Sequence, residues 1–415
     1  MNLERNRPEL LVPIQDWKSL NYIKNLPDAI YFGIDKYNMR LKANNFQRSD
    51  LSKITDYCHS QEPQIKAYLC TNILIYNSEL DDLENLIREA KEANVNAIIA
   101  HDIAAISLAK KYNLDFHIST QANISNIKSA IFYENLGAKR LVLARELSFI
   151  QIKEIKDQLK NTEIECFIHG SMCTAISGRC YLSATICQSE GFSANRGLCV
   201  QPCRREWKMI DDENHEIIYD GKLFLNSKDL CMIEHIPELI NSNIDAFKIE
   251  GRMKDPFYVK TITQCYKEAI NCYFNGNYNK EKINNWLERI LKVYNRGFHT
   301  GFYFKKPTIS EIQLNNRGNV SPFKKHYIGK VLNCNEATKI TQILLETTRI
   351  SLKLGDEIII IGNNTYSTEK ITKMKINNDE IISIKREKDE YPLQIDMILR
   401  NKVKINDKIY IISKI

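Results

Sequence analysis

The chain has 415 residues, of which 43% are hydrophobic and 26% charged, so it can bury the core of a full-sized domain and of a smaller second one. Glycine and proline are too few for a collagen-like or low-complexity chain, and no apolar run approaches the ~20 residues of a membrane span. The N-terminus lacks signal-peptide character, so we expect a cytoplasmic protein without membrane contact. The net charge of +7 suits a polyanionic partner, although a solvated lysine surface would give the same excess.

Short β-branched apolar runs alternate with amphipathic helical patterns through most of the chain. Helical spacing is clearest over residues 79–93, 102–112 and 126–137. Such alternation predicts a parallel sheet closed into a TIM-like α/β barrel, with its chemistry at the C-terminal strand ends. The eight predicted strands are residues 10–13, 29–34, 65–70, 96–102, 115–120, 139–146, 164–170 and 245–252.

The regular alternation breaks between the seventh and eighth runs, where an insertion covers about residues 171–231. Helical patterns at 255–276 and 281–295 then complete a first domain, which we place at residues 1–322. From residue 323 to 415 the sequence changes to short β-rich segments separated by Asn, Asp and Gly turns. This predicts a small all-β barrel, which either binds a partner or stabilises the first domain.

Seven of the twelve cysteines lie between positions 166 and 231. A reducing compartment argues against disulfides, and the absence of any CxxC pair weakens a structural zinc site. Iron–sulfur clusters accept thiolates from separate loops at wider spacings. The alternative is a chance grouping of buried thiols. The members of this group beyond the seventh strand are Cys173, Cys180, Cys187, Cys199, Cys203 and Cys231.

Polar residues follow most of the predicted strands. Arg145, Lys248, Arg252 and Lys254 come from separate strand ends and would form a positive basin for phosphate or carboxylate. His169 ends the seventh strand and could exchange protons with a substrate or serve the structure alone. Arg204 and Arg205 either add to the basin or belong to an exposed rim.

Several motifs resemble peptidase family U32, the collagenase-like proteins that include tRNA hydroxylation proteins. They are EIECFIHGSMCTAISGRCYLS from residue 163, NRGLCVQPCR from 195, NSKDLC from 226 and IDAFKIEGRMKDP from 244. The resemblance implies a barrel with a [4Fe–4S] cluster. Matching the motifs implies Cys173, Cys180, Cys199 and Cys231 as ligands, with Cys203 as the alternate third ligand, and leaves Cys166 and Cys187 out.

The same resemblance implies hydroxylation of the wobble uridine of tRNA at its 5-position, with prephenate as hydroxyl donor. The anticodon arm would bind the basic face, and a paralogous partner subunit is left open. In this interpretation His169 is catalytic, and the substrate-binding residues are Gln121, Arg145, Lys248, Glu250 and Arg252. The alternatives are hydroxylation of ribosomal RNA or a small molecule, and proteolysis by Cys187 or Cys203 with His169.

One departure from the family pattern lies at the start of the barrel. The segment VPIQD places Gln15 where a glycine is usual in APAGD. We therefore expect a different pocket shape at that point.

Overall fold

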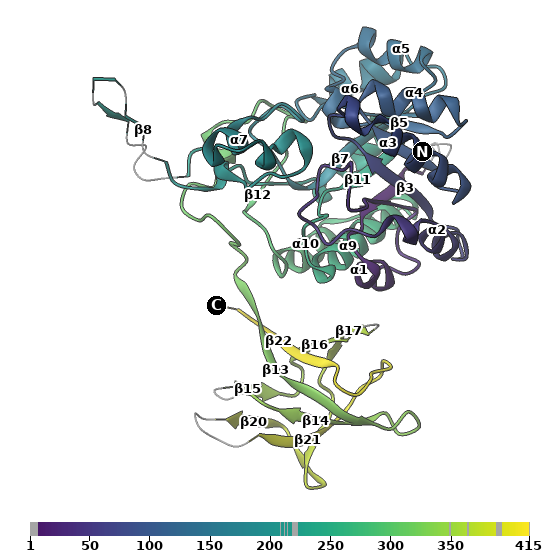
Figure 1. The fold of residues 1–415 in the computed structure, drawn as a ribbon. Coiled ribbons are helices and arrows are strands. Elements are labelled where there is room, and N and C mark those ends of the chain that lie inside the picture. Colours follow the sequence, from purple (N-terminus) through teal and green to yellow (C-terminus); the bar gives the residue numbers. More distant parts are fainter. Residues whose placement is uncertain are drawn as a thin grey trace. The chain divides into compact units, whose positions relative to one another are not determined.

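The computed structural model describes residues 7–207, 209–210, 212–213, 215–217, 223–347, 350–362, 365–386 and 392–414. The chain divides into two compact units, Met1–Val320 and Ser321–Ile415 (Figure 1). Each unit is described by itself.

The first unit is a closed barrel of eight parallel strands, as the sequence predicts. Each strand pairs with the next along the chain, and the eighth pairs with both the seventh and the first, which closes the ring. Apolar side chains from both faces of the strands are buried. The strands are β1 (Glu9–Pro13), β2 (Ala29–Phe32), β3 (Lys66–Thr71), β4 (Ala97–Ala100), β5 (Phe116–Ile118), β6 (Arg140–Val142), β7 (Glu163–Ser171) and β11 (Ala246–Ile249).

Helices surround this barrel, and the five predicted helical patterns all correspond to helices (Figure 1). Several begin at a side-chain cap; Asp102, Asn126 and Asp255 each accept a hydrogen bond from a backbone amide of the first turn. Their apolar faces pack on the strands. The helices are α1 (Trp17–Tyr22), α2 (Leu51–His59), α3 (Leu80–Glu92), α4 (Ile103–Lys111), α5 (Ile127–Asn135), α6 (Phe149–Lys156), α8 (Ile236–Asn241), α9 (Pro256–Phe274) and α10 (Lys280–Leu291).

The cysteine-rich insertion leaves the barrel after β7 and returns before α8. It contains α7 (Leu182–Cys187), a β8 (Met209–Ile210) and β9 (Glu216–Ile217) hairpin, and β10 (Asp229–Cys231). Strand β10 pairs antiparallel with the end of β7, and β12 (Phe298–His299) pairs with β10, so the sheet extends beyond the closed ring. The insertion is thereby attached to the C-terminal end of β7.

The second unit consists of antiparallel β-structure, in agreement with the predicted all-β domain. Its larger sheet has eight strands, and β15 (Ile350–Lys353) pairs separately with β20 (Ser383–Arg386). Alternating residues such as Ile328 and Val331 fill its own core. The larger sheet contains β13 (Phe323–Cys334), β14 (Ile340–Leu345), β16 (Glu357–Ile361), β17 (Tyr366–Lys370), β18 (Met374–Ile376), β19 (Asp379–Ile381), β21 (Leu393–Ile398) and β22 (Lys408–Lys414).

Across the described parts of both units, none of the helices combines the length and the apolar character that crossing a bilayer requires.

Candidate active site at the barrel mouth

A pocket opens at the C-terminal ends of the barrel strands, and all five residues predicted to bind substrate line it. Gln121 follows β5, Arg145 follows β6, and β11 with the loop after it supplies the other three. The strand ends of a parallel barrel converge at this face, which is why residues far apart in sequence meet here. The lining includes Tyr31, Arg40, Cys70, Asn72, Gln121, Arg145, Phe167, Lys248, Glu250 and Arg252.

Glu250 is the acidic centre of this pocket and is almost completely buried. Nε and Nη2 of Arg40 donate hydrogen bonds to its Oε1 at 3.2 and 3.1 Å. Burial alone raises the pKa of Glu250, but the guanidinium groups of Arg40, Arg145 and Arg252 hold that pKa below its usual range. Three cations therefore surround one carboxylate, and the pocket keeps an excess of positive charge.

Arg252 is held inside the wall of the pocket. Its Nη1 donates to Oδ1 of Asn38 at 3.0 Å, and its Nη2 donates to Asn45. Any side chain at residue 33 would collide with it, because a Cβ on Gly33 would lie 2.4 Å from Nη2 of Arg252. Among the described residues its buried Nε has no hydrogen-bond partner. Burial lowers the pKa of Arg252, so an anion in the pocket would compensate its charge.

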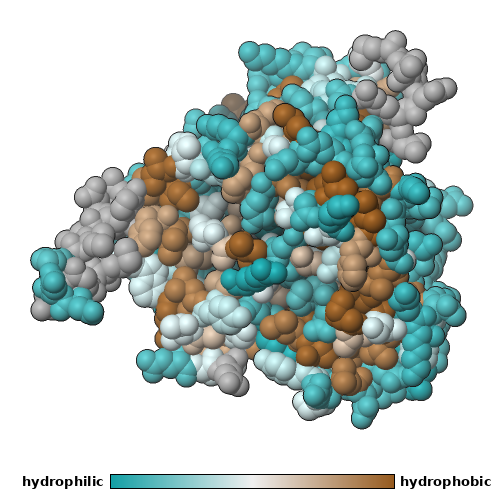
Figure 2. All heavy atoms as spheres, turned by 90° about the horizontal axis from the view of Figure 1, so that it is seen from above, coloured by the Kyte–Doolittle hydropathy of each residue, from teal (hydrophilic) through white to brown (hydrophobic). Residues whose placement is uncertain are grey.

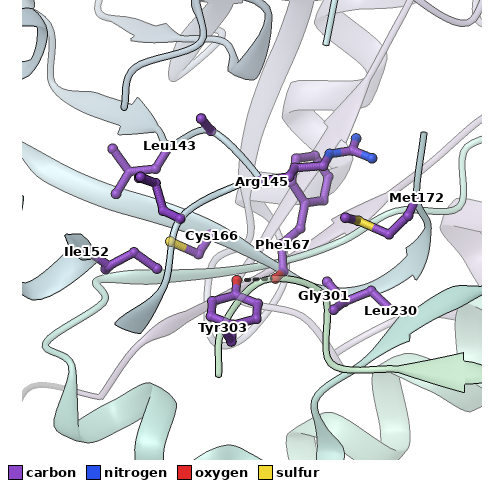
Figure 3. A pocket seen from close by; sticks show the side chains of 11 residues that line it. Leu143, Arg145, Ile152, Cys166, Phe167, Met172, Leu230, Gly301 and Tyr303 are labelled. Carbon is purple, nitrogen blue, oxygen red and sulfur yellow. Dashed lines mark hydrogen bonds between the residues drawn. The ribbon is translucent and has the colours of Figure 1, made fainter. Parts of the chain in front are cut away.

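Arg145 is half-buried, and its guanidinium lies 4.2 Å from the centroid of the Phe167 ring. Its Nη1 donates to the carbonyl of Ser171 at 3.1 Å, while the buried Nε again finds no partner within the described chain. Arg145 and Phe167 also line a second, small pocket, whose other walls are mostly apolar side chains (Figure 3). Figure 3 also shows the Tyr303 hydroxyl, which donates to the Phe167 carbonyl at 2.5 Å and fixes this wall.

Lys248 and Gln121 have partners within the barrel. Nζ of Lys248 donates to the fully buried Glu165 at 2.7 Å and lies 4.4 Å from the Tyr31 ring centroid. Oε1 of Gln121 accepts from Ser119 and, at 3.4 Å, from Asn72. The charge of Lys248 is therefore compensated inside the barrel, whereas Arg145 and Arg252 retain unused donors.

Four cysteines of the insertion gather beside this mouth. Burial raises the pKa of the Cys199 thiol, and so does the proximity of Cys173 and Cys180. The pKa of the Cys203 thiol is raised mainly by burial and also by Cys173, Cys199 and Cys180, so all four thiols lie within electrostatic range of one another. Arg40, which binds Glu250 in the pocket, also interacts with Cys173. The thiols and the pocket are thus neighbours.

Tight backbone contacts seat the insertion on the loops that follow the strands. Gly178, in the left-handed region, lies so close to Gln121 that a Cβ would be 2.8 Å from its Cγ. A Cβ on Gly197 would be 2.2 Å from the carbonyl oxygen of Asn38. Nδ2 of Asn123 donates to the carbonyl of Ser177 at 3.0 Å. These contacts require glycine at the two positions and fix the cysteine loops over the mouth.

Backbone and arginine hydrogen bonds order the cysteine loops further. The amide of Cys180 donates to Asn195 at 2.9 Å, and the amide of Gln201 donates to Sγ of Cys199 at 3.3 Å. Arg204 is buried and donates to the carbonyl of Met172 at 2.6 Å, which ties the Cys203 loop to the residue before Cys173. In the described portion of the chain no three Cys, His, Asp or Glu side chains converge closely enough to bind a single metal ion.

Cys231 and His169 lie apart from the pocket lining. They face each other across the β7–β10 pairing, and both pack against Tyr266 of α9. The Tyr266 hydroxyl donates to Sγ of Cys231 at 3.9 Å and lies 3.3 Å from Nδ1 of His169. Burial raises the pKa of the Cys231 thiol to about 12 and lowers the pKa of His169 to about 3, with Lys254 adding to the latter. Both groups are therefore neutral at physiological pH.

Arg40 is a charged pocket residue that the sequence-based assignment of substrate-binding residues left out. It belongs to the irregular loop after β2 and returns to Glu250, 210 residues further along the chain. The sequence marks that loop as polar, but it does not show which of its side chains reaches back over the mouth.

Comparison with known proteins assigns the chain to a family. The sequence profile described as Peptidase family U32 matches residues 15–313. The chain belongs to this family. A protein of Methanocaldococcus jannaschii named an uncharacterized protease is 39% identical over 98% of both chains. A protein of Porphyromonas gingivalis named collagenase is 35% identical over 98% of both chains. The tRNA hydroxylation protein P1 of Bacillus subtilis is 33% identical over 97% of this U32 chain and 93% of its own.

Proposed function

We propose that this chain is an iron–sulfur enzyme that hydroxylates the wobble uridine of tRNA at its 5-position, with prephenate as the hydroxyl donor. The observation that carries the proposal is the mouth pocket, in which Arg40, Arg145 and Arg252 exceed the single charge of Glu250. Guanidinium donors that have no hydrogen-bond partner within the described chain suit a small dicarboxylate such as prephenate. The relative named tRNA hydroxylation protein P1 matches along nearly its whole length, which supports the RNA substrate.

Cys173, Cys180, Cys199 and Cys203 fit a [4Fe–4S] cluster better than a set that includes Cys231. In such a cluster each thiolate binds a different iron atom, so the four sulfurs stand further apart than the ligands of one ion. The amide that donates to Cys199 and the arginines near Cys173 and Cys203 would stabilise the anionic centre. When bound, the cluster would supply redox-active iron beside the pocket.

The chain's own residues would then position the two substrates. Arg145 and Arg252 would hold the carboxylates of the donor, and the Arg40–Glu250 pair would fix its orientation next to the thiols. The apolar space behind Phe167 would exclude water from that side of the pocket. An anticodon loop offers unpaired bases, so the target uridine can reach the mouth without opening a helix.

Proteolysis, which the collagenase name of a relative raises, has little support in the geometry. A thiol peptidase needs a thiolate beside an imidazole that accepts its proton. His169 lies instead next to Tyr266, with a pKa near 3, and burial raises the pKa of the Cys203 thiol. His169 is therefore too weak a base to activate the Cys203 thiol.

The proposal is tested with anaerobically purified protein, unmodified tRNA and prephenate, followed by nucleoside mass spectrometry. We expect 5-hydroxyuridine at the wobble position, formed only when prephenate is present. Absence of the product with cluster-loaded protein, together with cleavage of a collagen peptide, would reject the hydroxylase and favour the peptidase.

The ligand set is tested by comparing Cys203→Ser with Cys231→Ser. We expect the first variant to lose the brown colour and blue-region absorbance of the anaerobic protein. The second should keep them, because Cys231 packs against Tyr266 in the core. The reverse result would restore Cys231 to the ligand set and remove Cys203.

A further inference from the structure

The rim of the mouth carries large apolar side chains that face solvent. On the face drawn in Figure 2, apolar side chains interrupt the hydrophilic surface in several places. The insertion contributes Tyr181, which is 72% exposed, together with Ile176 at 51% and Phe192 at 39%. Tyr76, from the loop after β3, is 58% exposed. Large apolar side chains that group together on the surface indicate a binding face, whereas singly scattered ones do not.

These side chains belong to the segments that cover the pocket. Ile176 and Tyr181 flank Gly178, which presses on Gln121 of the mouth. Arg196 donates to Glu79 at 2.6 and 2.8 Å and to the Leu74 carbonyl, which ties the insertion to the loop that contains Tyr76. Tyr181 directly follows Cys180 in the chain and caps α7. A group stacked on Tyr181 would therefore lie on the insertion that carries the thiols.

Cations alternate with the rings along this rim. Nζ of Lys42 lies 5.3 Å from the Phe192 ring centroid, and the Arg196 guanidinium lies 4.5 Å from that of Tyr76. Arg179, between Ile176 and Tyr181, is exposed. Within the described ranges, neither Lys42 nor Arg179 forms an ion pair with a carboxylate. The rim thus combines flat apolar faces with uncompensated positive charge.

We propose that this rim, consisting of Tyr76, Ile176, Arg179, Tyr181 and Phe192 with Lys42, is a stacking platform for the unpaired bases of an RNA loop. The inference rests on the proposed function and names the surface that the RNA would use. Aromatic rings accept the face of any base, and neighbouring lysine and arginine side chains bind the phosphates between them. A protein partner would fit the rings but would not need the free cations, so RNA is the occupant that the charge favours.

The test measures binding of a tRNA anticodon stem–loop to the full chain by fluorescence anisotropy, with the fully paired duplex of the same stem as a second probe. Tyr181→Ala and Phe192→Ala should each weaken stem–loop binding by about tenfold, the loss expected when one base no longer stacks on a ring. Duplex binding should change little. Arg179→Ala should reduce the salt dependence of stem–loop binding.

Phe132→Ala is the matched control, because Phe132 is 60% exposed but lies on α5 of the outer helix layer. It should leave stem–loop affinity unchanged. If the wild-type chain binds the stem–loop and Tyr181→Ala and Phe192→Ala bind it equally well, the platform is refuted while the RNA hydroxylase stands. If the wild-type chain binds no RNA, the proposed function fails first. Loss of self-association in Tyr181→Ala with unchanged RNA affinity would instead make the rim a protein interface.

Discussion

The two ends of the barrel both contain buried arginine and glutamate, but they balance their charges differently. At the N-terminal end, Arg140 is 2% exposed and contacts Glu9, Glu163 and Glu165 at 2.7, 2.5 and 3.3 Å. Here three carboxylates surround one guanidinium group, and Lys66 and Lys248 compensate the remaining negative charge. At the mouth, three guanidinium groups surround Glu250 alone. The first arrangement balances its own charges, and the second has more guanidinium groups than carboxylates.

This difference separates a structural network from a binding site within one barrel. Charges buried with all their partners contribute to folding, and the loss of one partner leaves the others uncompensated. Charges that lack a partner cost stability and are compensated only when a ligand arrives. The N-terminal network should therefore govern stability, and the mouth should govern activity.

The largest expected effect is on stability. Arg140→Met removes the central cation but keeps the bulk, so Glu9 and Glu165 are each left with a single lysine partner, and the free energy of unfolding should fall by about 3–5 kcal/mol. All three tryptophans, Trp17, Trp207 and Trp286, lie in the first unit, so urea unfolding followed by tryptophan fluorescence reports on the barrel. Arg88→Met, at a half-exposed ion pair on α3, should cost at most about 1 kcal/mol. Equal effects of the two substitutions would refute the closed network.

The second prediction concerns the mouth. Arg145→Met removes a guanidinium that donates a hydrogen bond to a backbone carbonyl, so the free energy of unfolding should change by only about 1 kcal/mol. Under the proposed function, the concentration of prephenate needed for half-maximal tRNA hydroxylation should rise about tenfold to a hundredfold, which corresponds to the loss of one charge-assisted hydrogen bond to the donor. A large loss of stability with unchanged prephenate dependence would show that Arg145 belongs to the structural class instead.

The barrel and the pocket lining could be predicted from the sequence because both follow from local patterns. Eight continuous β-branched runs specify buried parallel strands, and the C-terminal ends of such strands meet at one face. Arg145 and Glu250 therefore meet in one pocket although they come from different strand ends. The convergence of these side chains does not depend on the conformations of the loops.

The placement of His169 and Cys231 depends on features that the sequence does not show. Simple alternation puts His169 on the same face as Phe167, toward the barrel interior. A register shift between Lys248 and Ile249 pairs His169 with Ile249 instead, and the imidazole turns toward Tyr266. The antiparallel pairing of β10 with β7 then places Cys231 on the same side. These long-range strand pairings determine which cysteines lie close together.

The smallest expected effect is a pH dependence at the edge of the mouth. Nζ of Lys254 lies 3.2 Å from the Tyr294 ring centroid, and burial lowers the pKa of this lysine to about 7, with Asp229 opposing and Arg296 adding to the shift. A lysine whose pKa is depressed by folding binds its proton more tightly in the unfolded chain. Protonation therefore favours unfolding, so stability should rise with pH from about 7 toward the ordinary lysine value.

This dependence is isolated by subtracting the unfolding free energy of Lys254→Met from that of the wild-type chain at each pH. Groups that titrate in both proteins cancel in the difference. Between pH 7 and 8 the difference should rise by about 1 kcal/mol in favour of the wild type, slightly less than the change that one full proton gives per pH unit. Prephenate, if it binds beside Lys254, should favour the charged lysine and flatten the slope in this interval. If prephenate leaves the slope unchanged, Lys254 does not contribute to donor binding, and the arginines of the mouth bind the donor alone.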